Sequence, residues 1–378
     1  MAVFQHPDFD EHEHIAFLSD EAAGLHAIVA IHTTSRLGIA GGGCRMWPYA
    51  SDEDALRDVL RLSKAMTYKL ALAGIPSGGA KSVVIADPKT EKTEALLRAL
   101  GRAVHRLGGQ YVIAEDVGTT PDDMEIIAKE TPYCAGRSGG SGDTTPPTAY
   151  GTFMALEHAV QRKLERENLE GLRVAIQGVG GVGFRLGQLL VERGATLVVS
   201  DIDEAKVQRA LDELGAKAAI GDAIYDADVD VFAPCALGDV LSDETIARLK
   251  CSVVAGAANN QLPTEAQAQT LQDRGILYVP DFVANMGGVL GAARMSTATD
   301  EKMHDSLLRI VSTLEGVFDE AHAKGITPHA AAVAAAKRAV GEQRSTSGAG
   351  KLAASLWRNR FVARTALKVR NAIASARR

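Results

Sequence analysis

The sequence has few cysteines, no long hydrophobic run and no signal-peptide pattern at its start. Its four cysteines lie far apart in 378 residues, without the spacing of a metal site, so we expect free thiols in a reducing cytoplasm. The apolar runs are too short to cross a membrane, and residues 1–14 lack a basic start followed by an apolar stretch. His12 and His14 lack further ligands, so no metal site is expected. These absences predict a cytoplasmic protein without a membrane partner.

Acidic residues are missing from the end of the sequence. Nine lysines and arginines and no acidic residue lie between Arg344 and Arg378, so the rest of the chain is more acidic than the formal net charge of −6 indicates. An acidic body disfavours nucleic-acid binding, and no nucleic-acid partner is expected. The spacing of Leu352, Leu356 and Phe361 favours helical segments with an apolar stripe. Packing or disorder is the simpler interpretation of this basic tail, and binding of a partner is the alternative.

The chain is too long for one compact core, and it has a plausible boundary near its middle. Residues 138–151, SGGSGDTTPPTAYG, are rich in glycine, serine, threonine and proline, which is typical of a hinge. Strand and helix patterns alternate on both sides, which predicts the α/β fold class. We therefore expect domains at 1–145 and 146–330, followed by C-terminal helices and the basic tail at 331–378.

Several elements can be predicted from local patterns. Ser51 is a plausible N-cap for an amphipathic helix over 52–74, and Gly74 is a plausible stop signal. A proline ends an apolar run at 82–88, which predicts a strand. Further strands are expected in the first half at 25–32 and 110–116, and a second helix at 93–109.

A glycine-rich turn in the second half has the pattern of a dinucleotide-binding site. It follows an apolar strand, RVAIQ, and opens a helix, and the next strand ends in Asp201. In this context the helix N-terminus binds the pyrophosphate, and the Asp201 carboxylate accepts hydrogen bonds from a ribose and repels a 2′-phosphate. The sequence therefore predicts a Rossmann-type domain that binds NAD through Gly178, Val179, Gly180, Gly181, Val182 and Gly183.

Three ionisable residues of the first half occur in unusual settings. Lys69 lies among apolar residues near the end of the predicted helix. Lys81 follows two glycines and an alanine, at the entrance to the apolar run 82–88. Asp116 ends the predicted strand YVIAED, and strand ends that face a cleft are where α/β enzymes hold their catalytic groups.

The motifs of the chain resemble those of one enzyme family. They are, in order, GGGCRMWPY, MTYK, GGAKSVVIADP, AEDVGTT, PPTAYG, QGVGGVG, APCALG, AGAANNQL and PDFVANMGG. This series, over roughly residues 15–340, resembles the amino acid dehydrogenases for glutamate, leucine, phenylalanine and valine, and the leucine/phenylalanine branch most of all. The resemblance implies two domains around a cleft, C-terminal helices that return to the first domain, and a homo-oligomer formed by a first domain that also binds substrate.

The resemblance also implies a reaction and its residues. The family deaminates an L-amino acid reversibly with NAD, giving a 2-oxo acid and ammonia. Lys69 matches the lysine that holds the substrate carboxylate, and Lys81 matches the catalytic lysine. Asp116 matches the aspartate that exchanges a proton with the amino group. Asn260 and Asn259 match asparagines near the substrate and the nicotinamide.

The chemistry explains why a lysine is placed at position 81. After hydride leaves the α-carbon, water must attack an iminium ion, and that step needs a base near neutral pH. Burial and the nearby ammonium of Lys69 both disfavour the charged form of Lys81, so the neutral amine can act as this base.

Further positions match the ligand-binding residues of the family. The glutamate enzymes have a lysine where this chain has Gly41, so glutamate is not expected as the main substrate. Gly41 and Ala292 both enlarge the pocket compared with the leucine enzymes, and the choice between leucine and phenylalanine stays open. The other substrate positions are Gly42, Met66, Ala114 and Val289, and the other cofactor positions are Thr148, Ile202, Cys235, Ala236 and Ala257.

Two alternatives remain from the sequence alone. The segment after Gly288 departs from the family pattern, and Arg294 could recognise a polar group at the pocket entrance, which fits an unusual bulky amino acid. The second alternative is a non-catalytic NAD-binding scaffold that uses its basic tail to bind a partner.

Overall fold

The computed structural model describes residues 3–35, 38–137, 143–294 and 300–345, and the side chains of 294, 300–302 and 344–345 are not described. The basic tail from residue 346 and the side chain of Arg294 therefore lie outside the described part. The chain divides into two compact units: unit 1 is Met1–Gly142 with Arg338–Arg378, and unit 2 is Asp143–Lys337. No helix of the described residues is both long and apolar enough to cross a lipid bilayer.

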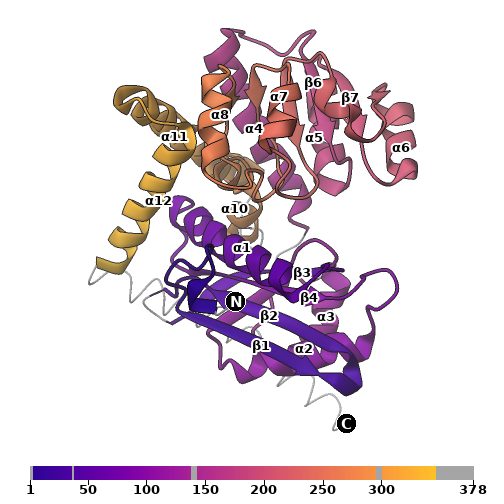
Figure 1. The fold of residues 1–378 in the computed structure, drawn as a ribbon, viewed down its shortest axis with the longest axis vertical. Helices are drawn as coiled ribbons and strands as arrows, with labels where there is room; N and C mark the ends of the chain where they lie inside the picture. The colour runs from indigo at the N-terminus through magenta and orange to yellow at the C-terminus, as the bar shows by residue number, and fades with distance from the viewer. Residues whose placement is uncertain (1–2, 36–37, 138–142, 295–299, 346–378) are drawn as a thin grey trace. The chain divides into compact units, whose positions relative to one another are not determined.

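Unit 1 is built on a five-stranded sheet of order β1-β2-β4-β3-β5 (Figure 1). Strands β3, β4 and β5 are parallel, β2 is antiparallel to β4, and β1 is antiparallel to β2. The strands are β1 His14–Asp20, β2 Leu25–Ile31, β3 Ala40–Trp47, β4 Gly78–Ile85 and β5 Tyr111–Glu115. The helices are α1 Asp52–Leu72, α2 Glu94–Arg106 and α3 Pro121–Ile127, with short 3-10 turns at Val3–Gln5 and Glu21–Ala23.

Helices cover both faces of this sheet. Buried residues of α1 pack with Ile28 and Val83 on one face, and residues of α2 and α3 pack with Cys44 and Met46 on the other. Figure 1 shows α1 on one side of the strands and α2 and α3 on the other side. Helix α1 thus packs on β2 and β4, and the parallel strands β4, β3 and β5 carry or precede the polar residues described below.

The start and end of α1 are as predicted. The Ser51 hydroxyl accepts a hydrogen bond from the Asp54 N–H at 3.1 Å, which satisfies one free donor of the first turn. Gly74 follows the helix with φ of +69°, a conformation that glycine adopts without steric cost.

Strand β4 begins earlier than predicted. It starts at Gly78, so Lys81 lies inside the strand and not at its entrance. Strand β3 was not predicted, because its run of three glycines has weak strand propensity. A β-carbon at Gly42 would lie 1.7 Å from the Ala80 carbonyl oxygen, so close approach to β4 requires a glycine here. Tertiary packing, which the local pattern does not contain, therefore explains both differences.

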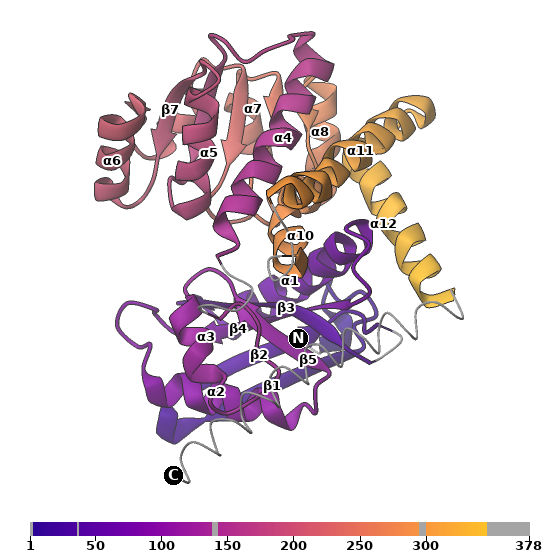
Figure 2. The same cartoon turned by 180° about the vertical axis from the view of Figure 1, so that it is seen from behind.

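Unit 2 is a six-stranded parallel sheet of order β11-β10-β9-β6-β7-β8. Helices α7 and α8 lie in front of it in Figure 1, and α4 and α5 lie in front in Figure 2. The strands are β6 Arg173–Gln177, β7 Thr196–Ser200, β8 Lys217–Ala218, β9 Val231–Pro234, β10 Val253–Val254 and β11 Leu277–Tyr278. The helices are α4 Thr145–Leu164, α5 Gly181–Val191, α6 Glu204–Leu214, α7 Asp243–Arg248, α8 Ala266–Asp273, α9 Asp281–Ala284, α10 Gly287–Arg294 and α11 Asp300–Lys324, with a 3-10 turn at Gly221–Asp226. Helix α12 Pro328–Ser345 begins in unit 2, and its residues from Arg338 belong to unit 1.

The strand order of unit 2 indicates at which edge of the sheet a ligand is expected to bind. The chain runs from β6 outward through β7 and β8, then returns to β9 beside β6 and continues to β10 and β11. This is the doubly wound Rossmann order, in which ligands bind at the carboxyl ends of the two strands where the direction reverses. The α/β fold predicted from the sequence is confirmed, and the reversal lies between β6 and β9.

Candidate functional site

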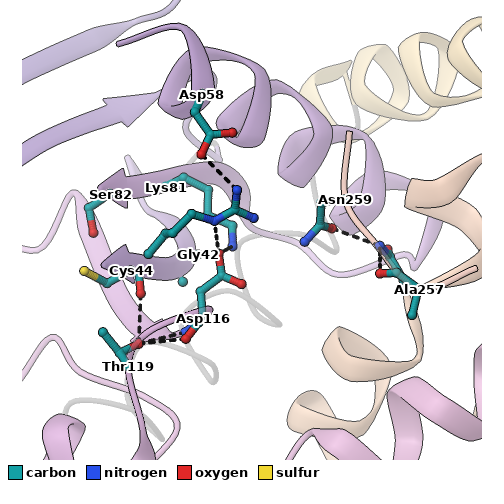
Figure 3. Close-up of polar contacts among 12 residues, drawn as sticks. Gly42, Cys44, Asp58, Lys81, Ser82, Asp116, Thr119, Ala257 and Asn259 are labelled. Carbon is teal, nitrogen blue, oxygen red and sulfur yellow. Dashed lines mark hydrogen bonds and ion pairs between the residues drawn. The ribbon is translucent and has the colours of Figure 1, made fainter. Parts of the chain in front are cut away.

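Lys81 and Asp116 form a buried ion pair in unit 1. Lys81 lies in the middle of β4 and is 7% exposed, and Asp116 directly follows β5. The Lys81 Nζ donates a hydrogen bond of 2.7 Å to Asp116 Oδ2 (Figure 3). The structure thus brings together the two residues that were assigned the catalytic roles.

The turn after β5 holds Asp116 in place. The backbone N–H of Asp116 donates to Thr119 Oγ1 at 2.9 Å, and the Thr119 hydroxyl donates to the Cys44 carbonyl at 2.8 Å (Figure 3). These bonds attach the loop to β3, the strand between β4 and β5. The carboxylate is therefore fixed by its backbone as well as by Lys81.

Gly43 provides the space for this pair. A β-carbon at this position would lie 2.4 Å from the Glu115 carbonyl oxygen, 2.8 Å from Asp116 Cβ and 3.1 Å from Lys81 Nζ. A side chain at Gly43 would therefore push the turn away from β3 and separate the two charged groups.

Arg45 is a third charged residue of the site, and the sequence reasoning did not assign it a role. It lies on β3 and is 6% exposed. Its Nη1 donates to Asp58 Oδ2 at 2.9 Å, and its Nε lies 3.6 Å from Asp116 Oδ2. Only the fold could reveal this, because Asp58 and Asp116 are distant from Arg45 in the sequence.

The two cations determine the charge state of Asp116. Burial alone raises the pKa of Asp116, but the charges of Lys81 and Arg45 and the Lys81 hydrogen bond outweigh burial and hold the pKa well below its usual value. Burial raises the pKa of the Cys44 thiol to about 12, and it also raises the pKa of Tyr111. Near neutral pH Asp116 is thus an ionised carboxylate beside two cations, while the Cys44 thiol and the Tyr111 hydroxyl are neutral.

Lys69 lies in the last turn of α1 and is 9% exposed. It is three residues after Met66, so both side chains leave the same side of the helix. A β-carbon at Gly42 would lie 3.5 Å from Met66 Cγ, so this side of α1 faces β3. The structure therefore directs Lys69 toward the sheet that carries Lys81.

The remaining substrate positions of unit 1 differ in what surrounds them. Gly42 is held against β4 by packing, which explains a glycine there without a ligand. A β-carbon at Gly41 would come no nearer than 3.7 Å to Ser77 Oγ, so a methyl group would fit there at ordinary van der Waals distance. Ala114, on β5, is partly exposed. Their contacts with substrate stay predictions.

The glycine turn of unit 2 has the geometry that a dinucleotide needs. Gly178 has φ of +94°, and a β-carbon there would lie 2.8 Å from the Ala236 nitrogen. Gly180 is the N-cap of α5, no described side chain caps that helix end, and a β-carbon at Gly180 would meet no atom within 4 Å. The first N–H groups of α5 are therefore open to an anion. Val179, Gly181, Val182 and Gly183 complete this turn.

Asp201 forms a hydrogen bond to the backbone of the glycine turn. Its Oδ2 accepts a hydrogen bond from the Val179 N–H at 2.9 Å, so the carboxylate at the end of β7 lies beside the glycines. Ile202, the next residue, is 95% exposed. Cys235 follows β9, and its N–H donates to the Gln177 carbonyl at 2.7 Å. Residues from β6, β7 and β9 thus meet at the predicted edge, and they fit a bound dinucleotide.

Two asparagines lie in a further loop of unit 2. Asn259 Oδ1 accepts a hydrogen bond from Asn285 Nδ2 at 2.9 Å, and the same nitrogen donates to the Ala257 carbonyl at 3.0 Å. Asn260 has φ of +53°, and its Nδ2 is buried without a hydrogen-bond partner among the described residues. A donor held this way is suited to a ligand. Asn285 was not predicted, although it lies in the quoted motif PDFVANMGG.

The other predicted positions of unit 2 lie on helices. The Thr148 hydroxyl donates to the Thr144 carbonyl at 2.7 Å, within the first turn of α4. Val289 and Ala292 lie on α10, where Ala292 is exposed and Val289 is partly exposed. Their contacts with cofactor or substrate stay predictions.

Comparisons with known proteins identify relatives of this chain. Residues 12–133 match the family model described as Glu/Leu/Phe/Val dehydrogenase, dimerisation domain. Residues 139–207 and 199–348 match the model described as Glutamate/Leucine/Phenylalanine/Valine dehydrogenase. A leucine dehydrogenase of Thermoactinomyces intermedius is 46% identical over 323 residues, which cover 85% of this chain and 86% of that protein.

Two further relatives are similar over most of the chain. A phenylalanine dehydrogenase of Bacillus thermotolerans is 42% identical over 333 residues, covering 85% of this chain and 86% of that protein. The crystal structure of an L-tryptophan dehydrogenase from Nostoc punctiforme matches with a TM-score of 0.70 and 41% identity, covering 89% of this chain and 97% of that one.

These relatives identify the protein as an amino acid dehydrogenase, and its two α/β units carry a buried lysine–aspartate pair and a dinucleotide-type glycine turn. The chain belongs to the Glu/Leu/Phe/Val dehydrogenase family. The resemblance inferred from the sequence motifs is therefore confirmed.

Proposed function

We propose that this enzyme catalyses the reversible, NAD-dependent oxidative deamination of an apolar L-amino acid to the 2-oxo acid and ammonia. The observation that carries the proposal is the 2.7 Å hydrogen bond between Lys81 Nζ and Asp116 Oδ2, buried beside Gly43. A buried amine next to a carboxylate provides the acid and base that deamination of an amino acid needs. The relatives named as leucine, phenylalanine and tryptophan dehydrogenases support an apolar side chain.

Each charged residue has one role in this proposal. Lys69 binds the substrate carboxylate, for which a buried ammonium is a strong counter-charge. Lys81 takes a proton from the attacking water, and Asp116 exchanges a proton with the amino group. While Lys81 is charged, its charge and that of Arg45 hold the pKa of Asp116 low, so the carboxylate is ionised and able to accept this proton.

The cofactor is held by residues of unit 2. The N–H groups at Gly180 and Gly181 bind the pyrophosphate, and Asp201 binds the adenosine ribose. NAD supplies the hydride acceptor when it is bound. The Asp201 carboxylate would repel a 2′-phosphate, and for this reason we propose NAD and not NADP. The buried amide of Asn260 would donate to substrate or nicotinamide.

The side chain of the substrate is selected partly by what is missing at Gly41. A glycine supplies no cation to bind a γ-carboxylate, and a β-carbon there would meet its neighbours only at van der Waals distance, which suits an apolar group. Both leucine and an aromatic amino acid fit this description. The match of residues 12–133 to a dimerisation domain supports a homo-oligomer.

The proposal is tested by measuring kcat/KM for leucine, valine, phenylalanine, tryptophan and glutamate, with NAD and with NADP, from the absorbance of the reduced cofactor. We expect at least one apolar amino acid to exceed glutamate by about 100-fold, because a pocket without a counter-charge leaves a carboxylate unpaired. We also expect NAD to exceed NADP with that substrate. Faster turnover of glutamate than of all four apolar substrates would contradict the proposal, and tight NAD binding without any turnover would favour the scaffold alternative.

A further inference from the structure

Arg45 is a buried cation that the mechanism above does not use. Figure 3 shows Asp58 and Asp116, the two residues whose carboxylates form ion pairs with its guanidinium. Its Nε lies 3.6 Å from Asp116 Oδ2, beyond hydrogen-bond distance, and has no hydrogen-bond partner among the described residues. A buried donor without a partner is costly, so a fold that keeps one needs a physical reason.

Arg45 is anchored by contacts outside the lysine–aspartate pair. Asp58, on α1, accepts from Arg45 Nη1 at 2.9 Å and from the Tyr49 hydroxyl at 2.6 Å. A guanidinium keeps its charge throughout the accessible pH range. Arg45 is thus a fixed positive charge beside Asp116, and Asp58 holds it there whether Lys81 is charged or neutral.

Lys81 is a different kind of partner. In the proposed reaction its ammonium first releases a proton to solvent, and the neutral amine then turns to the attacking water, so Asp116 loses the nearer of its two counter-charges. A carboxylate that is buried without a counter-charge tends to take up a proton. A protonated Asp116 would then retain the proton that it should return to the substrate nitrogen.

We propose that Arg45 is a positioning residue that keeps Asp116 ionised and in place when the charge of Lys81 is withdrawn. The Nε–H, which has no hydrogen-bond partner while Lys81 occupies Asp116 Oδ2, then becomes the donor that holds this oxygen. The inference rests on the roles proposed for Lys81 and Asp116, but the ionisation of Asp116 can be measured without turnover.

Other titratable groups near Arg45 and Asp116 do not replace this charge. Burial and the Asp58 carboxylate raise the pKa of Tyr49, and burial raises the pKa of the Cys44 thiol to about 12, so both stay neutral at ordinary pH. Asp58 is itself an anion, and its charge is paired with Arg45. Among the described residues, further titratable groups in this region are Tyr111 on β5, whose pKa burial also raises, Glu115, which lies against Gly136, and the ion pair of Lys92 with Asp123 on α3. Lys69 on α1 has the substrate carboxylate as its proposed partner.

The direct test compares Lys81→Met with Lys81→Met/Arg45→Met in the full-length chain. Carbon-13 NMR of labelled aspartate follows the Asp116 carboxyl against pH, and Asp116→Asn identifies its signal. We expect Asp116 to stay ionised at pH 6 in Lys81→Met. In the double variant we expect the midpoint of its titration to rise by about one to three pH units. A protonated Asp116 at pH 6 in Lys81→Met, or equal midpoints in the two variants, overturns the inference, whether or not the enzyme deaminates amino acids.

Conservative replacement keeps the test usable if the methionine variant does not fold. Lys81→Met/Arg45→Lys retains the charge but lacks Nε, so its Asp116 midpoint should lie above that of Lys81→Met by a smaller amount. With Lys81 intact, Arg45→Met should lower kcat by about 100-fold with NAD affinity unchanged, and Arg45→Lys should restore part of kcat. Arg57→Met, which removes an exposed ion pair on α1, is the matched control and should behave as the unaltered enzyme. A loss of kcat that lysine does not restore overturns the charge-based role.

Discussion

Among single residues, Gly43 shows how strongly the site depends on a missing side chain. The nearest atoms to a β-carbon there are a carbonyl oxygen and Asp116 Cβ, which no rotation of a side chain can move. Lys81 and Asp116 can approach to 2.7 Å only because β3 has no side chain at this position. The ion pair therefore depends on the backbone path of β3 as much as on its two charges.

Gly43→Ala should consequently destabilise the protein and reduce its activity. The added methyl group forces β3 and the turn after β5 apart, which we expect to lower the free energy of unfolding by about 1–3 kcal/mol. Urea unfolding measures this value, and Gly41→Ala is the control because its methyl group would come no nearer than 3.7 Å to another atom. Equal free energies of unfolding for the two variants would show that β3 accommodates the added methyl group without a loss of stability.

Residues that lie in recognisable sequence motifs could be given candidate roles before the structure was known. Lys69, Lys81 and Asp116 lie in motifs that name their roles through resemblance, and the glycine turn has a recognisable spacing. Arg45 lies in an equally clear motif, GGGCRMWPY, but its role depends on Asp58 and Asp116, which are 13 and 71 positions away in the sequence. A network of charges is a property of the folded chain, so no local pattern predicts it.

Among the elements, α1 does most to organise the charged site. Lys69 lies near its C-terminal end and Asp58 lies in its second turn, and apolar residues of α1 pack against Val83. Its N-cap was predicted correctly because capping is a local interaction. Strand β3 was missed, since packing against β4 and not local propensity explains its glycines.

Ser51→Ala should weaken the start of α1. The substitution removes the acceptor for the Asp54 N–H, and we expect the free energy of unfolding to fall by about 1 kcal/mol. Urea unfolding followed by circular dichroism measures the change. Ser19→Ala, the same chemical change at an exposed position of β1, should cost much less, and an equal loss in both variants would argue against a capping role.

Across the whole molecule, the charged residues of the proposed substrate site and the glycine turn of the proposed cofactor site belong to different units. Lys69, Lys81 and Asp116 lie in unit 1, and the turn at 178–183 with Asp201 lies in unit 2. The alternation of strands and helices predicted this α/β organisation, because the motifs of each half are local. A change to the charged pair of unit 1 should accordingly leave dinucleotide binding intact.

The most direct measurement is the turnover of Lys81→Ala with the best apolar substrate, together with its affinity for NAD. We predict that kcat falls by about 10²- to 10⁴-fold, because the water loses its base, while the NAD dissociation constant changes little. Lys129→Ala, at an exposed lysine of unit 1, is the control and should retain full activity. Near-normal kcat in Lys81→Ala would contradict the account, because the reaction would then proceed without the buried amine.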